Sequence, residues 1–102
     1  MSRIPATVIA EVHARSAGYC EACTRPLGAD GGVFHHRKLR SRGGQDTAVN
    51  LMELHPVCHN GHRYSIHGAP DRSERLGHMV AAGVDPATVA VIAEPNLFAV
   101  RF

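Results

Sequence analysis

The apolar residues of the chain fall into short groups separated by polar and glycine-rich stretches, and each group predicts a short element. Near the N-terminus, Val8, Ile9 and Val12 recur at helical spacing and form one apolar stripe. They predict a helix over Pro5–Ala17, which Gly18 ends.

The middle of the chain predicts two strands joined by a loop. Gly31–His36 begins with turn residues and ends as a short strand. Arg37–Val49 contains a glycine pair and has no periodicity, so we expect a loop there. Asn50–Leu54 alternates loosely between apolar and polar residues and predicts the second strand of the pair.

After the second strand, the pattern predicts short helices and a terminal hairpin. Pro56 opens a helix that carries Cys58 and His59, and Tyr64–His67 predicts a second short helical piece. Pro70–Leu76 predicts another helix. The last expected elements are the two strands of a C-terminal hairpin, at Thr88–Ile92 and Leu97–Phe102.

Composition indicates one small domain with a thin core. The 102 residues include two tyrosines, three phenylalanines and no tryptophan. A domain of this size buries only about 60–70% of its unfolded surface, so a covalent or metal staple is often needed. No apolar stretch approaches the roughly 18 residues of a membrane span. The N-terminus also lacks a signal-peptide pattern, so we expect a cytoplasmic protein that does not contact membranes.

The three cysteines indicate a metal site, because an odd number cannot form a closed disulfide set. Cys20 and Cys23 have the C-x2-C spacing of a metal knuckle, and His55 and Cys58 repeat that spacing. Structural zinc takes four Cys or His ligands. The two pairs therefore predict a Cys3His zinc site that ties the segment before the strands to the helix after them.

The order of the motifs carries more information than any one of them. C-x2-C is followed by His35-His36, Gly43-Gly44, Asn50 and then H-x2-C-H. This order resembles the HNH endonucleases, also called ββα-metal nucleases, in the zinc-stapled subgroup found in bacteriophage and actinobacterial proteins. Most of these relatives have Cys where His55 stands here. The resemblance covers about Ser16 to His67.

The resemblance implies a small α+β fold made of one domain, residues 1–102. Its ββα-metal (HNH) core with a structural zinc spans about residues 16–67, preceded by the N-terminal helix. Residues 68–102 would form an extension made of a helix and the C-terminal hairpin.

The resemblance also implies a metal-dependent DNA endonuclease that hydrolyses phosphodiester bonds. His36 stands at the position of the general base that activates water, and Asn50 stands where an amide holds that imidazole. His35 and His59 stand at two ligand positions of a catalytic metal. The third ligand is left open between the two remaining histidines of this region, His67, which we prefer, and His62.

A ligand set made only of histidines suits one divalent cation, Mg²⁺, Mn²⁺, Ni²⁺ or Zn²⁺, and favours a transition metal over Mg²⁺. The carboxylates do not form the cluster that a two-metal nuclease needs. They are scattered at Asp30, Asp46, Asp71 and Asp85. His78 lies beyond the resemblance and is interpreted as structural.

Four basic residues follow the histidine pair directly and predict contacts with a polyanion. They are Arg37, Lys38, Arg40 and Arg42. Taken alone they would fit a solvated loop better, but their place beside a candidate hydrolytic site favours contacts with a polyanion. No separate DNA-reading element is evident, so we expect DNA binding of low sequence specificity through phosphates. A protein partner that targets the nuclease, such as a phage packaging protein, would add specificity.

Two other functions remain open at this point. One is a zinc-stapled nucleic-acid-binding module without catalysis, and the other is an accessory subunit of a phage packaging machine that has kept the fold. Neither would require the set of His35-His36, Asn50 and His59. That set therefore favours the nuclease.

Overall fold

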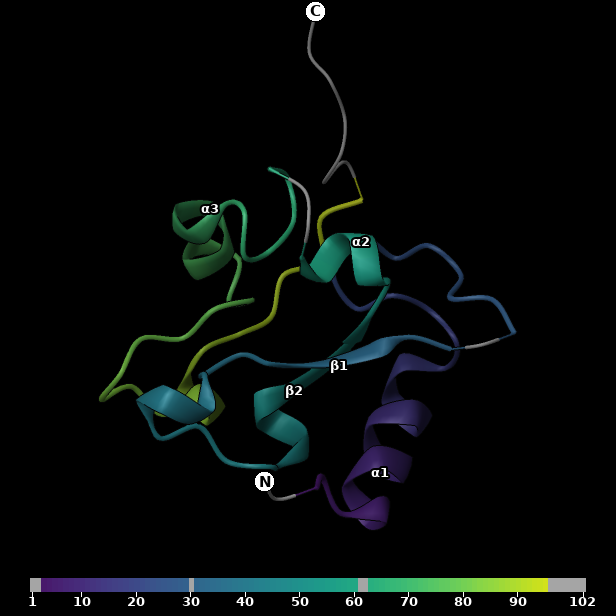
Figure 1. Cartoon of the computed structure of the whole chain (residues 1–102), viewed down its shortest axis with the longest axis horizontal. Coiled ribbons are helices and arrows are strands. Elements are labelled where there is room, and N and C mark those ends of the chain that lie inside the picture. The colour runs from purple at the N-terminus through teal and green to yellow at the C-terminus, as the bar shows by residue number, and fades with distance from the viewer. Residues whose placement is uncertain (1–2, 30, 61–62, 96–102) are drawn as a thin grey trace, which may run out of the picture.

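The computed structural model of the protein describes residues 3–29, 31–60 and 63–95. Its helices and strands are short and are arranged around a two-stranded sheet (Figure 1). In chain order they are α1 (Ala6–Ser16), β1 (Val33–His36), the 3₁₀ helices η1 (Arg40–Arg42) and η2 (Ala48–Asn50), β2 (Leu51–Leu54), α2 (Pro56–His59), α3 (Pro70–Arg75) and the 3₁₀ helix η3 (Pro86–Thr88). None of the helices in these ranges is long and apolar enough to cross a bilayer.

The sheet places the histidine pair at one end of an antiparallel pairing. In the register of β1 and β2, His35 lies opposite Met52 and His36 lies opposite Leu51. All four residues of β2 are buried. This strand therefore forms the centre of the small core, and β1 carries the two imidazoles beside it.

The core combines the cysteines with aliphatic side chains and methionines. Met52 and Leu54 of β2 pack with Ile66 and Met79. The same buried cluster contains the residues Cys20, Ala22, Cys23, Leu27 and Cys58. The three thiols are therefore part of the main hydrophobic core.

Helix α1 is fastened to the sheet by one buried carboxylate. Glu53 of β2 accepts hydrogen bonds from Ser16 Oγ at 2.6 Å and from His13 Nδ1 at 2.9 Å. The backbone amide of Gly32 reaches the same carboxylate at 3.3 Å. Burial of an ionised carboxylate is tolerated when such donors surround it. Glu53 thus joins α1, the start of β1 and β2.

Two expected elements differ from the structure. Tyr64–His67 is a turn rather than a helical piece. The expected strand at Thr88–Ile92 is also wrong, because η3 covers Thr88 and the segment after it carries no strand as far as residue 95. The partner strand expected at Leu97–Phe102 lies outside the described residues.

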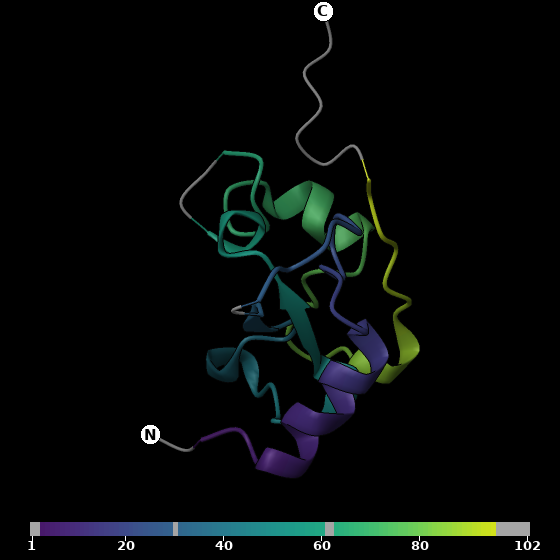
Figure 2. The ribbon, with the colours of Figure 1, turned by 90° about the vertical axis from the view of Figure 1, so that its right-hand side faces the viewer.

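The segment after η3 is bonded to the knuckle and to α3 instead of to a strand. Ile92 N–H donates to Leu76 O, and Glu94 N–H donates to Ala22 O, both at 2.8 Å. These contacts bring the end of the described chain back to the thiol cluster. The views of Figures 1 and 2 agree that α1 and α3 lie toward opposite ends of the molecule, with the sheet between them.

Candidate active site and metal centres

Three imidazoles from separate elements meet at one point. His35 comes from β1, His59 from the last turn of α2, and His67 from the turn that follows. Each offers a ring nitrogen, and these nitrogens lie within 4.8 Å of one another. The ring centroids are 4.8–5.2 Å apart. A set of this kind can hold one divalent cation. His35 is buried and His67 is exposed, so the set opens to solvent at His67.

Backbone hydrogen bonds fold His67 back onto α2. Ile66 N–H donates to Cys58 O at 2.7 Å, and His67 N–H donates to His59 O at 3.2 Å. The rings of His59 and His67 then meet edge-on, with their Nε2 atoms 3.2 Å apart. His62, the other candidate for this position, lies outside the described residues.

His35 is held in the neutral form and in one orientation. Its ring is buried and its Nε2 lies 2.7 Å from the carbonyl oxygen of His78. Since a carbonyl oxygen only accepts, Nε2 carries the hydrogen and Nδ1 keeps its lone pair for a cation. Burial lowers the pKa of His35 to about 3. A neutral imidazole is the form that binds metals.

His36 points away from the histidine cluster, as expected for the next residue of a strand. Its Nε2 lies 2.7 Å from Asp46 Oδ1, and Arg40 donates to the same oxygen at 3.0 Å. The hydrogen bond from His36, followed by that from Arg40, lowers the pKa of Asp46. An ionised Asp46 holds the hydrogen on Nε2 and leaves Nδ1 of His36 free to accept a proton.

Asn50 does not hold the His36 ring, which corrects the role expected for it. Its Oδ1 accepts from Lys38 N–H at 2.7 Å. Its Nδ2 donates to Lys38 O at 3.0 Å and to Gln45 O at 2.9 Å. The buried amide therefore clamps the loop that carries Asp46, and any effect on His36 passes through that loop.

The second residue of the glycine pair in this loop must be glycine for a steric reason. A Cβ atom at Gly44 would lie 1.7 Å from the carbonyl oxygen of Lys38. Only glycine permits this approach, which lets the chain turn back after η1. The turn brings Asp46 to His36, so the glycine pair acts by shaping the loop that carries Asp46.

The basic residues after the histidine pair divide into two groups. Arg37 is 2% exposed, and its guanidinium donates to the carbonyls of Gly77 at 2.7 Å and Val49 at 2.7 Å. Further bonds reach Pro86 and Val89. The structure therefore contradicts the expectation that Arg37 contacts DNA, because the side chain is buried and all three guanidinium nitrogens donate to backbone carbonyls.

The other three basic side chains lie nearer the surface. Arg40 is tied to Asp46, and Arg42 makes a long contact of 3.5 Å with Val80 O. Lys38 has its backbone clamped by Asn50. Lys38 and Arg42 therefore stay available for phosphate contacts, whereas Arg40 also serves the pair formed by Asp46 and His36.

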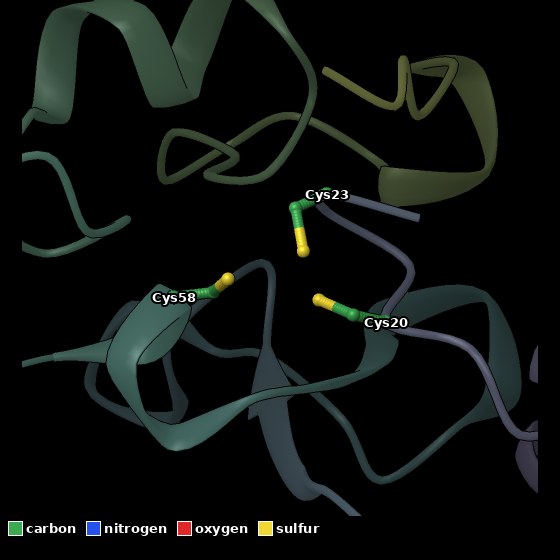
Figure 3. Close-up of side chains that lie close together, drawn as sticks. All are labelled: Cys20, Cys23 and Cys58. Atoms are coloured by element: carbon green, nitrogen blue, oxygen red, sulfur yellow. The ribbon is translucent and has the colours of Figure 1, made fainter. Parts of the chain in front are cut away.

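A second candidate metal centre is formed by three buried thiols. Cys20 and Cys23 come from the knuckle, and Cys58 comes from α2. Figure 3 shows the three sulfur atoms pointing toward a common centre. They lie within 4.8 Å of one another and form no disulfide. Soft thiolate ligands in this number fit zinc.

The environment of Cys20 favours its thiolate. A hydrogen bond from the Cys58 thiol lowers the pKa of Cys20 to about 5, and the backbone amides of Cys23 and His55 act in the same direction. The pKa of Cys58 is raised by its bond to Cys20, and burial raises that of Cys23. A cation at this site would replace the two thiol protons, since metal ligation requires thiolates.

His55, expected as the fourth zinc ligand, is not brought into the thiol cluster. It is the N-cap of α2, and its carbonyl accepts from Cys58 N–H at 3.0 Å and from His59 N–H at 3.2 Å. Its backbone amide, rather than its ring, faces Cys20. Pro56 at the first helical position sets this geometry by fixing where the helix begins.

Two functional candidates were missed in the sequence. Asp46 looked like one of several scattered carboxylates, and His78 like a structural residue. The structure brings Asp46 to His36 and the His78 carbonyl to His35. The only sequence signal for Asp46 was its place just after the glycine pair. None marked His78.

A two-stranded sheet, a following short helix and histidines from both form a candidate metal-binding site of the ββα type. The family model of the HNH endonucleases matches residues 20–64. Residues 20–64 therefore match an HNH endonuclease domain, which confirms the resemblance to this family seen in the sequence, whereas the zinc-stapled phage and actinobacterial subgroup stays a prediction. The matched range contains the knuckle, β1, β2 and α2. No curated protein matches the chain.

Proposed function

We propose that the protein is a metal-dependent DNA endonuclease with one catalytic cation and one structural zinc. The observation that carries this proposal is the meeting of His35, His59 and His67 beside a histidine, His36, that is already paired with a carboxylate. A module that only binds nucleic acid needs neither the cluster nor the pair.

The imidazoles of His35, His59 and His67 would hold the catalytic cation. When bound, a divalent cation supplies positive charge to the scissile phosphate and to the leaving oxygen. His35 uses Nδ1, because its Nε2 is bonded to His78. The three neutral nitrogens fit Mn²⁺, Ni²⁺ or Zn²⁺ better than Mg²⁺, which prefers oxygen ligands.

His36 acts as the general base through Nδ1. It takes a proton from the attacking water, and the resulting imidazolium is stabilised by Asp46, which lies 2.7 Å from the other ring nitrogen. The hydrogen bonds from His36 and then Arg40 lower the pKa of Asp46, and both hold its carboxylate in place. Asn50 contributes indirectly by fixing the backbone of the loop between them.

The thiols of Cys20, Cys23 and Cys58 would hold a structural zinc. Cys58 directly precedes His59, so a cation bound by the thiols fixes the backbone that carries a catalytic ligand. Folding and activity should therefore depend on the same zinc.

The substrate proposed is DNA, bound through its phosphates by Lys38 and Arg42 with low sequence specificity. A targeting partner, including a phage packaging protein, and an origin among phage or actinobacterial relatives stay predictions. So does a cytoplasmic location, where three reduced thiols are expected to persist.

Nicking of supercoiled plasmid by the purified protein tests the proposal. The reaction is run with EDTA and then with Mg²⁺, Mn²⁺, Ni²⁺ or Zn²⁺, alongside the His36→Ala variant prepared in the same way. Cleavage that needs a cation and His36 is the expected result. Binding of DNA without nicking under every condition would favour the non-catalytic module.

A further inference from the structure

The ring of His78 is fully buried and has one nitrogen without a partner. It follows the turn at Gly77, where His78 N–H donates to Ser73 O at 2.8 Å. Its Nε2 lies 2.8 Å from Ile92 O. Within the described part of the chain, Nδ1 is buried and makes no hydrogen bond.

The hydrogen bond to Ile92 decides the state of the orphaned atom. A carbonyl oxygen can only accept, so Nε2 carries the hydrogen and the lone pair of Nδ1 accepts no hydrogen bond. Burial lowers the pKa of His78, which keeps the ring neutral. A buried lone pair with no donor is destabilising. A neutral imidazole whose far N–H is bonded to a carbonyl is also the usual form of a metal-ligating histidine.

Three observations relate His78 to the thiol cluster. The segment that accepts its Nε2–H continues to Glu94, whose amide donates to Ala22 O between the two knuckle cysteines. Burial lowers the pKa of His78, while the hydrogen bond to Ile92 and the charge of Cys20 act in the opposite direction. Met79, the next residue, packs in the same core as Cys20.

We propose that Nδ1 of His78 is the fourth ligand of the zinc held by Cys20, Cys23 and Cys58, in place of His55. This inference rests on the structural zinc of the proposed function. His78 Nδ1 is not among the atoms within 4.8 Å of one another, so the ring moves toward the sulfur atoms when the tetrahedron closes.

This assignment links the two metal centres through one residue. The ring of His78 would bind the zinc while its carbonyl accepts the Nε2 hydrogen of His35. Zinc binding would then fix the His78 carbonyl, in the turn that follows α3, and through it the orientation of the His35 ring. His55 offers no such link, because its backbone carries its contacts to the knuckle and to α2.

The test compares metal binding by the full-length chain with His78→Leu, His78→Cys and His55→Ala. Zinc content and affinity are measured by metal analysis and competition with a chelator. The absorption spectrum of the Co²⁺-loaded protein reports how many thiolates and nitrogens bind. None of these readouts depends on nuclease activity.

His55→Ala should keep wild-type zinc affinity and the wild-type Co²⁺ spectrum. His78→Leu should lose more affinity than the roughly 10–100-fold that follows loss of an outer partner. His78→Cys should keep zinc and show stronger thiolate-to-cobalt absorption, because a fourth sulfur replaces nitrogen.

Retention of zinc affinity and spectrum by His78→Leu would overturn the assignment, as would their loss in His55→Ala. If His78→Leu does not fold, a His78→Cys spectrum equal to that of wild type overturns it instead. Wild-type protein that binds no zinc would show that the structural zinc itself is wrong, whatever the plasmid assay reports.

Discussion

The imidazole of His35 donates its Nε2 hydrogen to the backbone carbonyl of His78 at 2.7 Å, across a separation of 43 residues. The contact makes a residue outside the matched family segment responsible for the orientation of a ligand inside it. It also leaves the lone pair of Nδ1 as the one His35 can offer to a cation shared with His59 and His67. The extension after the HNH segment thus holds one histidine of the candidate active site in place.

The first prediction separates the base from the ligands. His36→Ala should lower the cleavage rate by about 10²–10⁴-fold, the usual contribution of a general base, and leave cation affinity unchanged. His59→Ala should weaken cation binding as well. Calorimetric titration of both variants with Mn²⁺ or Ni²⁺ checks this. Equal losses of affinity in the two would mean that His36 is itself a ligand.

The second prediction concerns Asp46 as the positioning residue of His36. Asp46→Asn keeps the size of the side chain and removes the charge that stabilises the imidazolium. We expect kcat to fall by roughly 10–100-fold, with little change in KM or in cation affinity.

A control for this variant is available at the N-cap of η3. The side chain of Asp85 lies in an exposed position and accepts from its own turn, at Ala87 N–H. Asp85→Asn should therefore leave kcat as in wild type. A normal rate for Asp46→Asn would show that the pair with His36 does not serve catalysis.

The third prediction divides the basic residues by their surroundings. The double variant Lys38→Ala, Arg42→Ala should bind duplex DNA more weakly, and its slope of log affinity against log salt should decrease by roughly 0.9 for each lost phosphate contact. Its melting temperature should barely change. Arg37→Ala should instead unfold at lower temperature, because four carbonyl groups lose their donor. An unchanged salt slope in the double variant would contradict the phosphate contacts.

The fourth prediction concerns the thiols. Purified protein should contain about one tightly held zinc per chain, and Cys23→Ser or Cys58→Ser should lose both zinc and cooperative unfolding, because the core is built around the sulfurs. Metal analysis and thermal denaturation measure the two effects. A zinc-free protein that is folded and unfolds cooperatively would refute the structural role of zinc.

The fifth prediction is a pH dependence of stability that arises from Glu53. Burial acts to raise the pKa of this carboxyl, but hydrogen bonds from Ser16 and His13 outweigh it, and the pKa lies below its ordinary value of 4.5. A lowered pKa in the folded state stabilises the protein above pH 4.5, and this contribution is lost as the pH falls through the folded value.

Glu53→Gln should therefore cost roughly 1.5–3 kcal/mol at pH 7, the range for hydrogen bonds to a charged group. The difference from wild type should shrink in acid, as both proteins then have a neutral side chain there. Chemical denaturation between pH 7 and pH 3 gives both quantities. A difference that stays constant over this range would assign the effect to packing alone.

The elements that depend on neighbouring residues could be predicted from the sequence. The apolar stripe of α1, the strand that ends at His35-His36 and the helix opened by Pro56 were all expected and are observed. Periodicity and spacing carry this information because each element is set by contacts a few residues apart. The histidines at positions 35, 59 and 67, which the structure gathers, were named instead by the resemblance of the motif order to the HNH family.

Roles that depend on a returning segment could not be predicted. Asp46 rather than Asn50 reaches His36 because the loop turns back at Gly44. Arg37 is buried because the carbonyls of the C-terminal extension converge on it. The absence of a strand at Thr88–Ile92 has the same origin.

These outcomes share one physical cause. A buried polar group must find a partner, and the partner can come from any part of the chain that folds close by. Arg37, His35 and Glu53 find theirs 40, 43 and 37 residues away. The sequence shows which side chains require hydrogen-bond partners. Only the packing of the chain determines which atoms become those partners.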